Sequence, residues 1–318
     1  MSPKDKKRGL SKSFMLSLQE GGLLHPLLTY VRKDPTICLE IRQNYVNIYY
    51  RGGNLIKIEE KDCYFASFDK NYGINRERIP RNEICNEADV EKWISAIPFL
   101  KQSMDFWFGA HPKEEREFQQ LVLRENNGSF IGNSTDYFVI DIEYDNHDGA
   151  RFDLIALEWK SVGVARKLKG GYAPKLCFIE MKYGDGAVSG KSGIISHIED
   201  FKDYLGKNGL KIIKEEMLTI LKQKRELGLI PALINNKNEI NTFSEQVDFL
   251  FLIANHDPAS RKLNDILNQV RNKYADETLG FNIKFCCSNF MGYGIYEQNV
   301  FTCPDFIGNF REQILCSS

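Results

Sequence analysis

The chain has 318 residues, with 42 Lys and Arg against 43 Asp and Glu, so its formal net charge is −1. This length suits one large domain or two modest ones, with ample hydrophobic core. A charge near zero excludes a strong overall field that would attract nucleic acid. This balance hides a local concentration of positive charge near the start, at Lys4, Lys6, Lys7, Arg8 and Lys12. This segment is either a solvated terminus or an arm that contacts phosphates.

The eight cysteines and five histidines show no metal-binding spacing. No Cys-x-x-Cys pair occurs and no histidine cluster lies beside a cysteine, which argues against a zinc or iron–sulfur site. No secretory signal is present, and no stretch approaches the ~20 apolar residues of a membrane span. We therefore expect a cytoplasmic protein with reduced cysteines and no membrane partner.

The first part of the chain is predicted to be β-rich. Four short β-prone runs, at residues 36–41, 45–50, 55–59 and 64–68, predict a small antiparallel meander. The sequence Arg51-Gly52-Gly53-Asn54 is typical of a hairpin turn. From Glu87 the apolar residues recur at helical spacing instead. This change predicts two domains, a β-rich region at 1–86 that carries the basic tail and a second domain at 87–318.

The second domain is predicted to alternate helices and strands. A helix at residues 113–125 precedes a hairpin made of 137–144 and 152–157, and then comes a strand at 176–182. The remaining expected elements are helices at 193–205 and 212–227, a strand at 246–254, a helix at 258–274, and strands at 281–287 and 292–297. No internal repeat interrupts this order.

Three charged residues stand inside apolar strand sequences. Asp153 lies in the strand at 151–157, while Glu180 and Lys182 lie in the strand at 176–182. A buried charge without a partner is costly, so these residues require a reason. Glu180 and Lys182 share a face because residues two apart in a strand point the same way. Two carboxylates and a lysine at a sheet edge are suited to metal-assisted phosphodiester hydrolysis.

This pattern resembles the PD-(D/E)xK nuclease superfamily. The matching residues are Asp153 and Glu180-Met181-Lys182, with 26 residues between Asp153 and Glu180. Phe152 stands where the name-giving Pro would be, and the resemblance covers roughly residues 113–205. It implies an α/β (α+β) fold with a restriction-endonuclease-like core, in which helices flank a central mixed sheet. The antiparallel meander would be an addition to this core.

The resemblance also implies roles for these residues. Asp153 and Glu180 would bind the cation with the backbone carbonyl of Met181 as a further ligand, and Lys182 would orient the attacking water or offset phosphate charge. Mg²⁺ or Mn²⁺ is expected because the ligands are hard oxygens. The alternative readings are a turn-capping Asp153 and, for Glu180 and Lys182, a solvent-facing polar edge of an amphipathic strand.

Two further carboxylates are candidate catalytic residues. If the hairpin turn centres on residues 147–148, strand residues whose numbers sum to 296 face each other, which places Glu143 opposite Asp153. Two such carboxylates repel unless a cation lies between them. Asp141, two residues before Glu143, is expected to point to the same face, one step deeper in the strand. The superfamily usually adds a helix glutamate, here Glu115, with Glu114 and Glu117 left open as alternatives to it. The ordinary explanation for these glutamates is a charged first turn favoured by the helix dipole.

Basic residues suggest where nucleic acid would bind. The loop between the hairpin and the Glu180 strand leads into that strand, so we expect it to reach phosphates near the metal. The candidates are Arg166, Lys167 and Lys169, helped by Lys160 and Lys175, together with Lys191 and His197 beyond the strand. The alternative is ordinary surface polarity, including a mobile charged loop that keeps the protein soluble.

The sequence therefore predicts a Mg²⁺-dependent endodeoxyribonuclease, a hydrolase acting in defence against foreign DNA or in repair. One alternative is a nuclease-fold protein that binds nucleic acid or a protein partner without cutting. A second is an unrelated protein in which the pattern arose by chance. The sequence leaves open DNA against RNA, sequence specificity, the role of the N-terminal region and the oligomeric state, a homodimer included.

Overall fold

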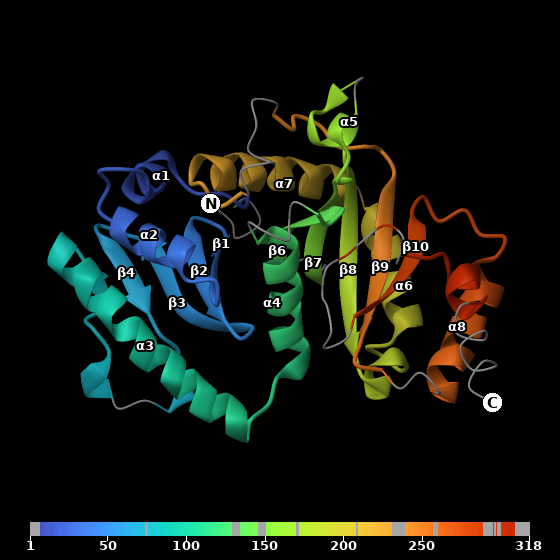
Figure 1. Ribbon diagram of the computed structural model, residues 1–318, viewed down its shortest axis with the longest axis horizontal. Helices are drawn as coiled ribbons and strands as arrows, with labels where there is room; N and C mark the ends of the chain where they lie inside the picture. The colour runs from blue at the N-terminus through green and yellow to red at the C-terminus, as the bar shows by residue number, and fades with distance from the viewer. Residues whose placement is uncertain are drawn as a thin grey trace. The chain divides into compact units, whose positions relative to one another are not determined.

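The computed structural model describes residues 7–73, 76–128, 134–145, 151–169, 172–207, 209–230, 239–256, 260–288, 295, 297 and 300–308. The protein is α+β, with two five-stranded sheets that share no strand in these ranges (Figure 1). The chain divides into two compact units. The first unit is Met1–Arg124 with Glu216–Ile230, and the second is Glu125–Glu215 with Pro231–Ser318. The division falls inside two helices, α4 (Glu114–Asn127) and α7 (Gly209–Glu226).

The sheet of the first unit is the predicted antiparallel meander, in the order β1-β2-β3-β4-β5. Its strands are β1 (Ile37–Ile41), β2 (Tyr45–Tyr50), β3 (Gly53–Glu60), β4 (Tyr64–Ser67) and β5 (Glu83–Ile84). The predicted hairpin turn is confirmed between β2 and β3. Arg51 and Gly52 both have positive φ, 49° and 71°, as a type I′ turn requires.

Two helices that the sequence analysis did not predict precede the meander, α1 (Lys12–Leu18) and α2 (His25–Lys33). Ser11 caps α1 by accepting a hydrogen bond from the backbone N–H of Phe14. Arg8, part of the basic start, is buried, and its backbone N–H donates to Glu216 Oε1 at 3.2 Å. Arg8 is therefore not part of a free phosphate-binding arm, and residues 1–6 lie outside the described ranges.

The predicted domain boundary at residue 86 falls inside the first unit. Asn86 caps α3 (Glu87–Ala110), whose buried face includes Val90, Trp93 and Met104. The indole of Trp93 donates to the carbonyl of Arg81 at 3.0 Å. The change from strand to helical spacing at this point marks a helix that covers the meander, because both need an apolar partner. It does not mark a domain boundary.

The sheet of the second unit is mixed, in the order β10-β9-β8-β7-β6. Strand β7 (Arg151–Glu158) runs antiparallel to both of its neighbours, β6 (Tyr137–Asp145) and β8 (Lys175–Tyr183). Strands β9 (Val247–Ala254) and β10 (Asn282–Ser288) continue the sheet in parallel from β8. The predicted hairpin and strands are therefore present. The predicted turn at 145–149 and strand at 292–297 lie largely outside the described residues.

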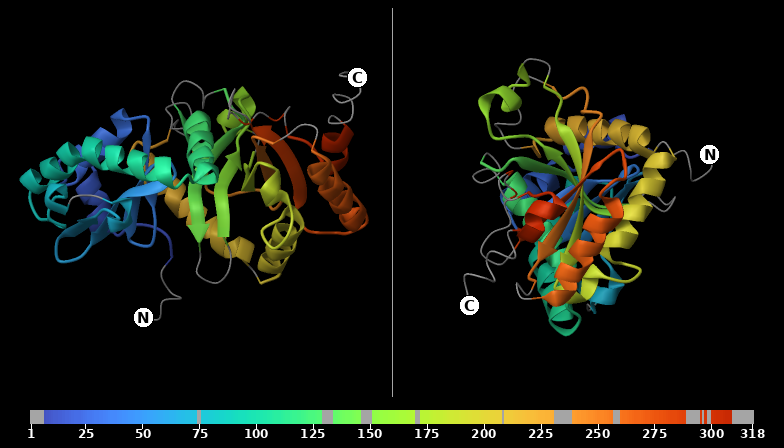
Figure 2. Two further views of the ribbon diagram at one scale, coloured as in Figure 1. Left: turned by 90° about the horizontal axis from the view of Figure 1, so that it is seen from below. Right: turned by 90° about the vertical axis from the view of Figure 1, so that its right-hand side faces the viewer.

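Helix α6 (Ile194–Gly206) follows β8 and is held against the sheet by an aromatic cluster. The Phe201 ring lies 4.9 Å from that of Phe178 on β8 and 4.5 Å from that of Phe249 on β9. Helix α8 (Arg261–Tyr274) contacts α6, and Figure 2 shows both beside this sheet. These contacts fix the side of α6 that faces the strands, and they position the candidate site.

Candidate functional site

The strands β7 and β8 part at one end, and Asp153 lies at the point of separation. Their last paired residues there are Leu154 and Ile179, so the next step of the register brings Asp153 opposite Glu180. Asp153 Oδ2 accepts a hydrogen bond from the backbone N–H of Met181 at 2.7 Å. The Met181 N–H thus donates to a side-chain carboxylate where a regular ladder would offer a backbone carbonyl. This bond holds the Asp153 carboxylate between the two strands.

The neighbouring strand β6 is irregular at the matching position. The pairs Ile142–Leu154 and Tyr144–Phe152 flank Glu143 and follow the predicted register, in which paired numbers sum to 296. Glu143 itself has φ 47°, a left-handed conformation that costs a non-glycine residue about 1–2 kcal/mol. Strain of this kind concentrates at functional sites. Glu143 and Asp153 therefore occupy opposed positions where both strands depart from regular geometry.

Glu180 is the centre of a buried charged group. Lys182 Nζ lies 3.0 Å from Glu180 Oε1, and His197 Nε2 on α6 lies 3.1 Å from the same oxygen. Glu180 is 6% exposed and Lys182 3%. Because Phe201 packs against the sheet one helical turn after His197, α6 carries the imidazole over Glu180. Both contacts meet at one oxygen and fix the rotation of the carboxylate.

The His197 imidazole is held uncharged. Burial, and next the positive charge of Lys182, lower the pKa of His197 to about 4, while a hydrogen bond with the Ser192 backbone acts in the opposite direction. A neutral imidazole carries one N–H, so at neutral pH the ring donates either to Glu180, through Nε2, or to the Ser192 backbone, and not to both. His197 was predicted to bind nucleic acid, and its contact with Glu180 was not predicted. Its position beside the buried Ile194, Ile198 and Phe201 was the available signal.

The backbone of Met181 faces the same gap between β7 and β8. The N–H and C=O of one strand residue point toward the same neighbouring strand. The Met181 N–H points to Asp153 on β7, whereas the Gly184 N–H, three residues later, donates to the carbonyl of Ala254 on β9, the strand on the other side of β8. The Met181 carbonyl therefore faces Asp153, as a metal ligand there would have to.

The ligand types fit a divalent cation, but the side chains do not form a ready three-ligand site. Asp153, Glu180 and the Met181 carbonyl offer hard oxygens of the kind that Mg²⁺ and Mn²⁺ prefer. Within the described ranges, however, no three His, Cys, Asp or Glu side chains are grouped closely enough to hold a metal ion. One oxygen of each carboxylate already has a partner, Asp153 Oδ2 with the Met181 N–H and Glu180 Oε1 with Lys182 and His197.

The helix glutamates belong to the other unit. Glu117 accepts hydrogen bonds from Arg51 Nε and Nη2, at 2.8 and 2.9 Å. Gln120 Oε1 accepts from the Gly52 N–H at 2.6 Å. Glu117 thus serves to hold the β2–β3 hairpin. Glu115 also lies in the first unit, and its catalytic role stays a prediction.

The basic loop between β7 and β8 was expected to reach phosphates near Asp153 and Glu180, but it lies at the opposite end of the two strands. It joins the end of β7 to the start of β8, whereas Asp153 is near the start of β7 and Glu180 near the end of β8. Five residues of extended strand from Lys175 to Glu180 span roughly 17 Å. The loop therefore does not lead to Asp153 and Glu180, since antiparallel strands carry its two ends away from them.

Several of the loop's basic residues have structural partners. Arg166 donates to the Thr135 carbonyl and lies over the Trp159 ring, 5.7 Å from its centroid. Lys160 pairs with Glu297. Lys167 and Lys169 are exposed, as is Lys191 in the turn before α6. Their proposed role in nucleic-acid binding stays a prediction.

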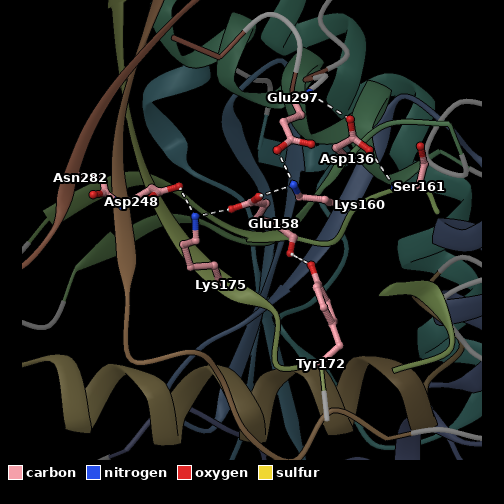
Figure 3. Close-up of polar contacts among 9 residues, drawn as sticks. All are labelled: Asp136, Glu158, Lys160, Ser161, Tyr172, Lys175, Asp248, Asn282 and Glu297. Carbon is pink, nitrogen blue, oxygen red and sulfur yellow. Dashed lines mark hydrogen bonds and ion pairs between the residues drawn. The ribbon is translucent and has the colours of Figure 1, made fainter. Parts of the chain in front are cut away.

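A second charged cluster lies at that other end of β7 and β8 (Figure 3). Lys175 Nζ lies 2.8 Å from Glu158 Oε2 and 3.0 Å from Asp248 Oδ2, and Asn282 donates to Asp248 Oδ1 at 2.7 Å. Burial alone lowers the pKa of Lys175, but hydrogen bonds and charge from Glu158 and Asp248 outweigh it and raise that pKa above its usual value. The sequence analysis did not single out this cluster.

Comparison of the chain with protein-family models, with curated proteins and with solved structures gives no significant match. The resemblance based on Asp153, Glu180 and Lys182 therefore stays a prediction from the sequence. Across the described ranges, no helix combines the length and the apolar character needed to span a membrane.

Proposed function

We propose that the second unit is a metal-dependent nuclease of the PD-(D/E)xK type, with a restriction-endonuclease-like core, that hydrolyses phosphodiester bonds of DNA. The proposal rests on Asp153 and Glu180 at the point where β7 and β8 part, with Lys182 3.0 Å from Glu180. Mg²⁺ or Mn²⁺ would be held by Asp153, Glu180 and the Met181 carbonyl. Such an ion supplies a polarising charge at the phosphate and lowers the pKa of bound water.

Lys182 supplies positive charge at this site. Its side chain is 4% exposed, so water does little to screen the ammonium group. A charge fixed in this way stabilises negative charge that develops on a phosphate in the transition state. Lys182 would also orient the attacking water, because its three N–H donors radiate from one atom.

His197 is a positioning residue in this proposal. It is neutral at pH 7, and with its single proton on Nε2 it would donate to the same Glu180 oxygen as Lys182. The imidazole thus orients the carboxylate without adding a second positive charge beside the lysine. Outer-sphere hydrogen bonds of this kind hold a carboxylate in the orientation that ligation needs.

The test is cleavage of plasmid, linear duplex, single-stranded DNA and RNA with Mg²⁺ or Mn²⁺, against EDTA. Asp153→Asn and Glu180→Gln are the informative variants, because each amide keeps the size of the carboxylate and can still accept a hydrogen bond. Asp248→Asn is the matched control, because Asp248 is buried like Glu180 but lies on β9 beside the other end of β8. We expect metal-dependent cleavage of DNA by the wild type and the control, and none by Asp153→Asn or Glu180→Gln.

One observation favours a second candidate function, binding of nucleic acid or a protein partner without cutting. Glu180 is already engaged by Lys182 and His197, and the described residues form no three-ligand group. A titration of fluorescent duplex DNA in Ca²⁺ and in EDTA separates the candidates. Binding without cleavage under every metal condition selects the second function. Cleavage that survives in Asp153→Asn and Glu180→Gln removes the proposed site.

A further inference from the structure

Two cysteines face each other across neighbouring strands of the first unit. Strands β4 and β5 are antiparallel, and their pairs are Phe65–Glu83 and Tyr64–Ile84. One further step of this register brings Cys63 opposite Cys85. Both side chains therefore leave the two strands on the same face.

The type of pair suits a disulfide. The Ala66 N–H donates to the Asn82 carbonyl at 2.7 Å, which marks those opposed residues as a hydrogen-bonded pair. Hydrogen-bonded and non-hydrogen-bonded pairs alternate along an antiparallel ladder. Counting three steps from Ala66 makes Cys63–Cys85 a non-hydrogen-bonded pair, with Cα atoms about 4.5 Å apart. This separation lies within the ~4.4–6.8 Å range that a disulfide bridges.

The two cysteines occupy opposed positions and can be reached from solvent. Cys85 is exposed and Cys63 is partly exposed. Cys177, Cys286 and Cys303 are buried by contrast. The contact with Cys63, then burial, then the charges of Glu83 and Asp89 raise the pKa of Cys85 to about 11. The Cys85 thiol is therefore protonated at neutral pH, and the case for the pair rests on the opposed positions of the two cysteines.

We propose that Cys63 and Cys85 are a redox pair that forms an intramolecular disulfide by exchange with a low-molecular-weight disulfide. One cysteine sulfur attacks the small disulfide, breaks its S–S bond and releases the first small thiol. The second cysteine then attacks the protein sulfur of this mixed disulfide and releases the second small thiol. Two protein thiols are oxidised, one small disulfide is reduced to two thiols, and both cysteine protons end on the released thiols.

The bond would fasten the start of α3 to the sheet. Cys85 lies between the two-residue edge strand β5 and Asn86, the N-cap of α3. A link from Cys63 to Cys85 closes the chain between β4 and α3 and restricts the unfolded state of this segment. The oxidised first unit should therefore unfold at a higher temperature than the reduced one.

The experiment uses the full chain and cystamine, a dicationic disulfide suited to the nearby carboxylates of Glu83 and Asp89. Free thiols are blocked with N-ethylmaleimide, and intact mass and non-reducing peptide mapping follow. We expect the count of blockable thiols to fall by two, with the Cys63 and Cys85 peptides linked. Dithiothreitol should reverse both the link and the rise in Tm.

Single substitutions make the result decisive. Cys63→Ser and Cys85→Ser should each stop at a mixed disulfide with cysteamine, whereas Cys38→Ser, a control in β1, should still form the link. The proposal is overturned if both thiols of the wild type carry cysteamine without joining, or if another pair links instead. No part of this test depends on nuclease activity.

Discussion

The two ends of β7 and β8 hold the same residue types in different arrangements. We term the group of Asp153, Glu180, Lys182 and His197 the open end, and the group of Glu158, Lys175, Asp248 and Asn282 the closed end. At the closed end the ladder is complete, with Glu158 paired directly to Lys175. At the open end the ladder stops at Leu154 and Ile179, and the Asp153 carboxylate bonds the Met181 N–H.

The difference shows that two carboxylates and a lysine do not by themselves identify a functional site. The closed end places one cation between two carboxylates within regular backbone, which satisfies buried charge. The open end interrupts the backbone pairing and keeps Glu143 at φ 47° on the adjacent strand. A structure that only had to neutralise charge would have no use for this strain. Backbone irregularity is therefore what favours function at the open end.

The sharpest test of this comparison is one glutamate exchange at each end. Glu180→Gln should abolish metal-dependent cleavage, because the amide cannot supply the ligand charge. Glu158→Gln should leave cleavage within a few-fold of the wild type and lower the free energy of unfolding by about 1–3 kcal/mol. Plasmid cleavage and urea unfolding measure the two effects. Equal loss of cleavage in both variants would contradict the assignment of separate roles.

Replacement of the lysine at each end should lower the free energy of unfolding by different amounts. Lys175→Met leaves Glu158 and Asp248 buried without their shared cation, and should cost about 2–4 kcal/mol, since breaking a buried pair is strongly destabilising. Lys182→Met leaves Glu180 its hydrogen bond from His197 and should cost about half as much, yet it should remove cleavage. Urea unfolding in EDTA is the measurement, and a larger loss for Lys182→Met would reverse our interpretation.

The open end should also confer a pH dependence on the metal-free protein. Folded His197 stays neutral down to its pKa of about 4, whereas an unfolded histidine gains a proton below its ordinary pKa of 6.5. The unfolded state then binds more protons between these values, so stability falls as pH decreases through this window and is flat above it. The full effect is at most about 3 kcal/mol. Urea titrations of wild type and His197→Gln from pH 7 to 4 in EDTA should differ in slope, and parallel curves would contradict this.

The smallest expected effect concerns Glu143. Glycine accepts φ 47° without strain but loses more chain entropy on folding, so Glu143→Gly should raise stability by about 0.5–1 kcal/mol. Glu143→Ala keeps the strain and should give no such gain. Both variants should reduce cleavage if the carboxylate serves the site. If Glu143→Ala raised stability as much as Glu143→Gly, the gain would come from relief of charge repulsion at Glu143 and not from relief of backbone strain.

The sequence by itself determined the elements and the central part of the site. Apolar periodicity located every strand of the two sheets except the two-residue β5, and the turn near residue 147 predicted the register around Glu143 and Asp153, because these features depend on residues close in the chain. The placement of Asp153, Glu180 and Lys182 in apolar strands pointed to the open end. The N-terminal helices α1 and α2 were missed, since helices this short depend on tertiary packing.

Only the tertiary structure decided which side chains meet. His197 reaches Glu180 because Phe201 anchors α6 on β8 and β9, a contact between elements that no local spacing encodes. The basic loop proved distant from Glu180 because β7 and β8 run antiparallel. The closed end gathers Lys175 and Asp248, 73 residues apart in the chain. These contacts form because apolar faces of different elements pack together. Such packing joins residues that are far apart in the sequence, and local periodicity does not encode it.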